Sequence, residues 1–132
     1  MKTEQRKKIL IVDDERLTRA VLQHDIILAG FDVITATNGQ EAMQRIREAV
    51  PDLVVVDLVM PDMNGFEMCR KIRGYEGTKK TPVIVVSALQ SKSDQEDAKS
   101  SGADLYLTKP VKAEEFVAHI KKFLGSPFKS PS

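Results

Sequence analysis

Three short runs of almost purely aliphatic residues constrain the fold of this chain more than any other feature. They cover residues 9–12, 53–56 and 83–86, and most of their members are β-branched. Runs of this kind are typical of strands that are buried on both faces, as the strands of a parallel sheet are. The runs therefore predict a parallel sheet with helices packed on both sides.

Stretches with a helical period alternate with these runs. One helix face is marked by Ala42, Ile46, Ala49 and Val50, and another by Phe116, Ile120, Phe123 and Leu124. The alternation predicts strands over 8–13, 31–36, 52–57, 82–87 and 104–108, and helices over 15–29, 39–49, 64–73, 92–101 and 112–124. Right-handed connections then give an α/β fold with a doubly wound, five-stranded parallel sheet. The strand over 31–36 is the more polar of the early ones and is expected at an edge.

The length and ends of the chain suggest one domain. Its 132 residues can bury a core of their own. We expect an N-terminal arm over 1–7, the domain itself over 8–125, and a C-terminal tail or the start of a linker over 126–132.

Charge and composition exclude several classes of partner. The net charge is +1, from 20 basic and 19 acidic residues, which offers no electrostatic attraction to nucleic acid or to an anionic membrane. The most apolar run, over 53–60, is too short to cross a bilayer and contains Asp57. No signal peptide pattern is visible, and the single cysteine, Cys69, suits a reducing compartment. The expected location is the cytoplasm.

Polar residues stand where the predicted strands end. Asp13 and Asp14 close the first, Asp57 the third, Ser87 the fourth and Lys109 the fifth. Ligands of open α/β sheets bind at the carboxyl ends of the strands. Crowded carboxylates repel one another and call for a divalent cation such as Mg²⁺, while a hydroxyl and an ammonium suit a phosphoryl group. The set predicts a phosphoryl-transfer site in which Asp57, as nucleophile, forms an acyl phosphate.

Each of these residues has a plainer explanation when it is taken alone. Asp57 could be a turn or capping residue, and Asp13 or Asp14 could cap the helix that follows. Ser87 could simply end a strand, and Lys109 could be an ordinary surface lysine. The phosphoryl-transfer interpretation depends on all of them meeting at one edge of one sheet.

Four segments together resemble the receiver domain of two-component response regulators. They are residues 11–15 (IVDDE), 57–65 (DLVMPDMNG), 86–88 (VSA) and 102–110 (GADLYLTKP), and the similarity extends from about 8 to 124. The resemblance implies a flavodoxin-like fold with strand order 2-1-3-4-5. It also implies a signalling domain that catalyses only its own phosphorylation and dephosphorylation.

The resemblance implies a role for each acidic residue. Asp57 would accept a phosphoryl group from a sensor histidine kinase or a histidine phosphotransfer protein. Asp13, Asp14 and Asp57, with the backbone carbonyl of Val59, would bind Mg²⁺ or Mn²⁺.

It also implies how the site would signal. Lys109 and Ser87 would bind the phosphoryl oxygens, and the peptide between Lys109 and Pro110 would be cis. Ser87 and Tyr106 would form the switch that moves the surface of the fourth helix, fifth strand and fifth helix, where an output partner would bind. Phosphorylation would then bias two existing states.

Three positions differ from patterns common in the family. Leu105 stands where one DNA-binding subfamily carries an acidic residue used in its dimer, which argues against that mode of dimerisation. Val59 and Leu89 occupy positions that tune dephosphorylation, and neither side chain can orient a water molecule. We therefore expect slow self-dephosphorylation.

Three alternatives remain at this stage. A degenerate receiver would bind a partner without being phosphorylated. An aspartyl-phosphate phosphatase of the haloacid-dehalogenase kind would need a second acid two residues after its nucleophile, where this chain has Val59. A nucleotide or flavin carrier would need a glycine-rich phosphate loop after the first strand, where this chain has Asp13 and Asp14.

Overall fold

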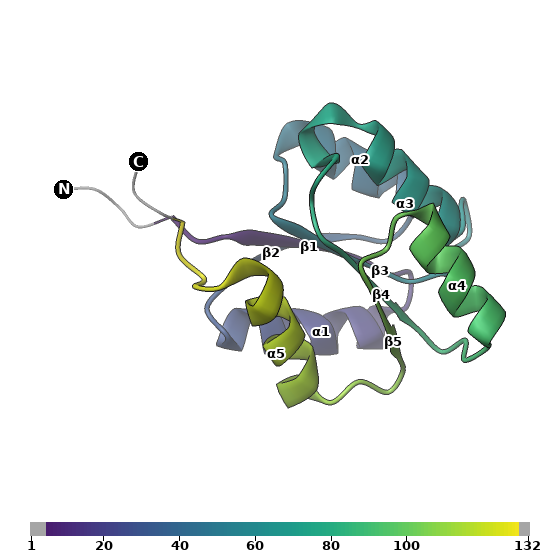
Figure 1. Cartoon of the computed structure of the whole chain (residues 1–132). Helices are drawn as coiled ribbons and strands as arrows, with labels where there is room; N and C mark the ends of the chain where they lie inside the picture. The colour runs from purple at the N-terminus through teal and green to yellow at the C-terminus, as the bar shows by residue number, and fades with distance from the viewer. Residues whose placement is uncertain (1–4, 130–132) are drawn as a thin grey trace.

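The computed structural model describes residues 5–129, in which strands and helices alternate along the chain (Figure 1). The strands are β1 (Lys8–Val12), β2 (Asp32–Ala36), β3 (Leu53–Val56), β4 (Val83–Ser87) and β5 (Leu105–Thr108). The helices are α1 (Arg16–Leu28), α2 (Gly39–Glu48), α3 (Gly65–Gly74), α4 (Lys92–Ser101) and α5 (Ala113–Leu124), with a short 3-10 helix η1 (Glu76–Thr78) after α3. Every predicted strand and helix is present, and each bound lies within one residue of its prediction; η1 was not predicted.

The five strands form one parallel sheet in the order β2-β1-β3-β4-β5, which confirms the predicted fold and the edge position of β2. The register places Val12 opposite Val56, and Val56 opposite Val85. The carboxyl ends of these three strands therefore lie side by side, and the residues that follow them meet at one edge of the sheet.

The helices form two layers around the sheet. Helices α1 and α5 cover one face, and α2, α3 and α4 cover the other (Figure 1). Successive residues of a strand point to opposite faces, so Ile9 and Ile11 pack under α1 and α5 while Leu10 and Val12 pack under the other layer. Each such side chain contributes roughly 1.5–3 kcal/mol on burial.

Two residues of the predicted helix faces are not buried. Val50 is 45% exposed because α2 ends at Glu48, two residues earlier, so Val50 no longer lies on its inner face. Phe123 is 39% exposed on the last turn of α5. Ala42, Ile46, Phe116 and Ile120 are fully buried as predicted, whereas Ala49 and Leu124 are only partly buried.

The described parts of the predicted arm and tail pair with each other. Arg6 and Phe128 form an antiparallel bridge, and the Arg6 guanidinium lies 5.5 Å from the centre of the Phe128 ring. The N–H of Lys7 donates to the carbonyl of Pro127 at 2.7 Å. This pairing lies at the amino end of β1, away from the edge that carries the aspartates. Residues 1–4 and 130–132 of the predicted arm and tail lie outside the described residues.

Between residues 5 and 129, none of the helices combines the length and the apolar character needed to cross a bilayer.

Candidate functional site

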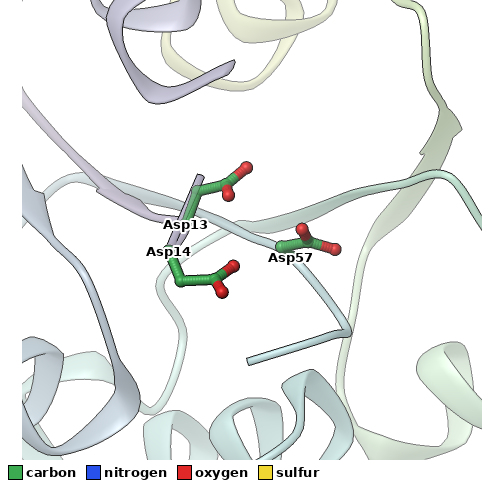
Figure 2. Close-up of side chains that lie close together, drawn as sticks. All are labelled: Asp13, Asp14 and Asp57. Carbon is green, nitrogen blue, oxygen red and sulfur yellow. The ribbon is translucent and has the colours of Figure 1, made fainter. Parts of the chain in front are cut away.

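Three carboxylates converge at the carboxyl edge of the sheet. Asp13 and Asp14 follow β1, Asp57 follows β3, and one carboxylate oxygen from each lies within 4.8 Å of the others. Figure 2 shows the neighbouring pair on one segment and Asp57 on another. Asp13 and Asp57 are only 2% and 8% exposed, whereas Asp14 is open to solvent. The structure thus brings together the three aspartates that the sequence singles out.

Backbone hydrogen bonds explain why Asp13 and Asp57 are neighbours. The N–H of Asp57 donates to the carbonyl of Val12 at 3.0 Å, so β1 and β3 stay paired up to the site. One carboxylate oxygen of Asp13 accepts the N–H of Glu15 at 2.8 Å, just before α1 begins. This bond orients the carboxylate and leaves its second oxygen to accept a hydrogen bond from Lys109.

Lys109 reaches the carboxylates from the loop after β5. Its Nζ lies 3.0 Å from Asp57 Oδ2 and 3.2 Å from Asp13 Oδ2. Its own N–H donates to the carbonyl of Ser87 at 2.8 Å, and the peptide that joins it to Pro110 is cis. The ammonium therefore bridges two buried carboxylates that come from separate strands.

Burial and the charge of the neighbouring partner shift the pKa values of Asp13 and Lys109 in opposite directions. Burial raises the pKa of the Asp13 carboxyl above its usual value, and the hydrogen bond from Glu15 and the charge of Lys109 offset this only in part. Burial alone would lower the pKa of Lys109. The hydrogen bond to Asp57 and the charges of Asp13 and Asp57 outweigh burial, so the pKa of Lys109 is raised and its ammonium form is favoured.

The predicted switch residues meet at the loop between β4 and α4. Ser87 is fully buried, and its Oγ accepts the N–H of Leu89 at 3.2 Å. The hydroxyl of the half-buried Tyr106 donates to the carbonyl of the same residue, Leu89, at 2.7 Å. Burial raises the pKa of this hydroxyl. Ser87 and Tyr106 are therefore hydrogen-bonded to the same residue, Ser87 to the backbone N–H of Leu89 and Tyr106 to its backbone carbonyl.

The loop over 58–64 connects Asp57 to the start of α3. The N–H of Gly65 donates to the carbonyl of Leu58 at 2.9 Å. A Cβ at Gly65 would lie 2.5 Å from the carbonyl oxygen of Asp57 and 2.7 Å from Leu58 Cα, so only glycine allows this approach. Val59 is 60% exposed, and its N–H donates to Asp57 Oδ1 at 3.3 Å.

One residue of this loop, Asp62, was not predicted to have a role. Its carboxylate accepts hydrogen bonds from the N–H groups of Gly39 and Gln40, at the start of α2. No local sequence signal connects Asp62 to a helix that begins 23 residues earlier. The Asn38 cap of the same helix, in contrast, is visible in the sequence as an N-cap residue type directly before it.

The donor set suits a hard divalent cation. Three carboxylates outnumber the single ammonium of Lys109, which leaves an excess of negative charge. All the candidate ligand atoms of the three aspartates are oxygens, as Mg²⁺ requires, and the exposed Asp14 gives access from solvent. The residues present therefore fit a magnesium ion, and a phosphoryl oxygen could complete its coordination.

An open apolar surface lies beside this cluster. Leu17 and Val21 of α1 are 77% and 58% exposed. They line a cleft together with Lys109, Pro110 and Val111 of the loop after β5. This cleft and the carboxylate site therefore share Lys109.

The chain matches known proteins over most of its length. Residues 9–121 match the family model described as the response regulator receiver domain. The alkaline phosphatase synthesis transcriptional regulatory protein PhoP of Bacillus subtilis is 36% identical over 89% of this chain and 48% of its own length. The polar-differentiation response regulator DivK of Brucella anthropi is 32% identical over 90% of this chain and 97% of its own.

The fold is also similar to that of a solved structure from the same family. It is that of a putative response regulator from Chloroflexus aurantiacus, with a TM-score of 0.87 and 31% identity, and the match covers 91% of this chain and 98% of that one. The chain spans about half the length of several curated relatives that it matches, PhoP among them, but nearly all of DivK.

Proposed function

Because this chain belongs to the response regulator receiver domain family, we propose that it accepts a phosphoryl group on Asp57. The donor is a phosphohistidine of a sensor histidine kinase or of a histidine phosphotransfer protein. The observation that carries the proposal is the position of Asp57, almost buried at the end of β3 and flanked by Asp13 and Lys109. Receiver domains are signalling domains, so the modification serves to change a contact with another protein.

Magnesium is the cofactor that the site would hold. Asp13, Asp14 and Asp57 would bind it together with the backbone carbonyl of Val59, and Mn²⁺ has the same preference for oxygen ligands. When bound, the ion would offset the negative charge of the carboxylates and stabilise charge on the phosphoryl oxygens.

The residues of the chain then have separate tasks in the transfer. A carboxylate oxygen of Asp57 forms a bond to phosphorus, the phosphorus–nitrogen bond to the donor histidine breaks, and the imidazole leaves with the bonding electrons. Lys109, whose pKa is raised, stays charged and moves its ammonium from the Asp57 carboxylate to the phosphoryl oxygens. Asp13 keeps its orientation through the bond from Glu15.

The donor protein would pack against the apolar cleft of α1. Support comes from the exposed side chains of Leu17 and Val21, next to Pro110 and within the same cleft as Lys109. Burying these side chains against the donor would hold the phosphohistidine in line with Asp57. Protein donors would therefore depend on this surface, and small phosphodonors would not.

Ser87 and Tyr106 would carry the signal to the face made by α4, β5 and α5. Both side chains hold Leu89, one at its N–H and the other at its carbonyl. If the Ser87 hydroxyl turns to a phosphoryl oxygen, the N–H of Leu89 loses its acceptor and the β4–α4 loop shifts together with Tyr106. A coupling of about 1–3 kcal/mol would change the affinity for an output partner about 5- to 150-fold.

Intact mass measurement after incubation with acetyl phosphate and Mg²⁺ tests this function. The expected result is the gain of one phosphoryl group, which is lost on chelation of the metal and in Asp57→Asn. Asp32→Asn, at the opposite end of the sheet, serves as the matched control and keeps the gain. A folded wild-type protein that gains nothing from acetyl phosphate or from any phosphohistidine donor would instead be a degenerate receiver.

A further inference from the structure

The loop over 58–64 is tied to a helix that is not its neighbour in sequence. Asp62 Oδ1 accepts the N–H of Gly39 at 3.0 Å, and its Oδ2 accepts the N–H of Gln40 at 2.8 Å. Oδ1 also accepts the N–H of Met63 at 2.9 Å. One carboxylate therefore connects the loop that follows Asp57 with the first residues of α2.

The two partners of Asp62 in α2 are backbone N–H groups that need an acceptor. The first N–H groups of a helix have no partner within it, and the helix dipole favours a negative charge at that end. Asn38 already accepts the N–H of Glu41 at 2.8 Å as the ordinary cap of α2. Asp62 supplies a second, charged cap from outside the helix. Its bonds from Gly39 and Gln40 outweigh burial, which acts in the opposite direction, and lower the pKa of the carboxyl.

Apolar packing strengthens the same connection. Gly39 is buried, and a Cβ at this position would collide with the side chain of Met63. Met63 therefore lies directly on the first residue of α2. The loop is joined to the helix by hydrogen bonds through one residue and by packing through the next.

The connection matters because it adds to the few bonds that hold the middle of the loop, among them the 3.3 Å hydrogen bond from the N–H of Val59 to Asp57 Oδ1. The two ends of the loop are joined by the hydrogen bond from the N–H of Gly65 to the carbonyl of Leu58, at 2.9 Å. Val59 lies between Leu58 and Asp62, and its side chain is 60% exposed, so packing does little to restrain it. The N–H of Val59 is held by Asp57, and the path of the backbone beyond it depends on the Leu58–Gly65 bond and on the attachment of Asp62 to α2.

We propose that Asp62 is a positioning residue for the metal site, because it holds the loop against α2 so that the carbonyl of Val59 faces the three aspartates. The inference rests on the proposed magnesium site and adds a residue that binds neither metal nor phosphoryl group. Coupling is reciprocal, so an ion that fixes the carbonyl of Val59 must also stabilise the attachment of Asp62 to α2.

Mg²⁺ affinity, measured by calorimetry or by NMR titration of the unphosphorylated protein, tests the proposal. Asp62→Ala is expected to weaken binding by about tenfold, in the range found for residues that support metal ligands from outside the coordination shell. Asp62→Asn keeps one carbonyl acceptor and is expected to fall between wild type and Asp62→Ala. Asn38→Ala is the matched control: it removes a cap hydrogen bond that lies within the same helix, and it is expected to bind Mg²⁺ within about twofold of wild type.

Amide hydrogen exchange is a second test. If Asp62 were only a helix cap, Mg²⁺ would not change the exchange rates of the amides that it caps. In wild type, Mg²⁺ is expected to slow exchange at Gly39 and Gln40, and this slowing should be absent in Asp62→Ala. Equal Mg²⁺ affinity of Asp62→Ala and wild type, or an equal loss in Asn38→Ala, would overturn the proposal. Those outcomes leave phosphorylation of wild type intact, whereas failure of wild type to bind Mg²⁺ or to accept phosphate would overturn the proposed function as well.

Discussion

The ammonium of Lys109 lies 3.0 Å from Oδ2 of Asp57, across 52 positions of sequence. The bond joins the loop after β5 to the end of β3 and places a positive charge at the residue proposed to accept the phosphoryl group. In the metal-free protein, this charge is the counter-ion of the nearly buried carboxylates. On phosphorylation, the same ammonium would bind the phosphoryl oxygens, so Lys109 would contribute to stability in one state and to signalling in the other.

Removal of this ammonium should destabilise the metal-free protein. Lys109→Met leaves the carboxylates of Asp13 and Asp57 without their charged donor, and a buried acceptor that loses its partner costs about 1–3 kcal/mol. Urea unfolding should therefore show a lower free energy of unfolding by about that amount. Mg²⁺ should restore part of the loss, and a free energy of unfolding equal to that of wild type without metal would contradict the assigned ion pairs.

The same lysine should make stability depend on alkaline pH. The pKa of Lys109 is raised in the folded protein above the ordinary 10.5, so the folded state holds this proton more tightly than the unfolded chain does. Its contribution is complete below 10.5 and is lost as the pH rises through the folded value. The difference in free energy of unfolding between wild type and Lys109→Met should therefore shrink at high pH. A difference that stays constant would show that Lys109 does not titrate as proposed.

Two glycines of α3 provide a matched pair. Gly65→Ala places a Cβ 2.5 Å from the carbonyl of Asp57, where rigid backbone cannot yield, and should cost roughly 1–3 kcal/mol. It should also weaken Mg²⁺ binding, because it displaces the loop beside Asp57. Gly74→Ala, at the other end of α3, meets no described atom within 4 Å and should be neutral or stabilising by up to about 1 kcal/mol. Equal thermal stability of the two variants would contradict the close approach at Gly65.

The apolar cleft of α1 should matter for protein donors alone. Leu17→Ser should slow transfer from a phosphorylated histidine protein by about tenfold or more, because a central apolar anchor is lost. Labelling by acetyl phosphate should be unchanged. Leu28→Ser is the control: Leu28 is 73% exposed on the same helix, roughly 16 Å farther along its axis. Equal slowing in both variants, or slowing with acetyl phosphate as well, would place the donor elsewhere.

Much of this structure follows from the sequence because the relevant signals are local. The buried runs and helix periods predicted the five strands and the five α-helices within one residue, and the strand ends pointed to the three aspartates and Lys109, which the structure brings together. Strand order followed from the family resemblance, since periodicity does not specify which strands are neighbours.

The contacts that were missed join distant segments. Asp62 and Gly39 are brought together only when α2 and α3 pack on the same face of the sheet, and neither residue signals this by itself. The pairing of Arg6 with Phe128 depends in the same way on the return of the chain after α5. Val50 was wrongly expected to be buried because helical period alone does not specify where α2 ends.

Chemical mapping of the phosphorylated residue tests the central claim most directly. Sodium borohydride reduces an aspartyl acyl phosphate to homoserine, which peptide mass spectrometry then locates in the chain. After treatment with a phosphodonor and Mg²⁺, homoserine should be found at position 57 and should be absent without donor, without metal and in Asp57→Asn. Homoserine at Asp13 or Asp14, or a phosphorylated protein without homoserine at 57, would contradict the account.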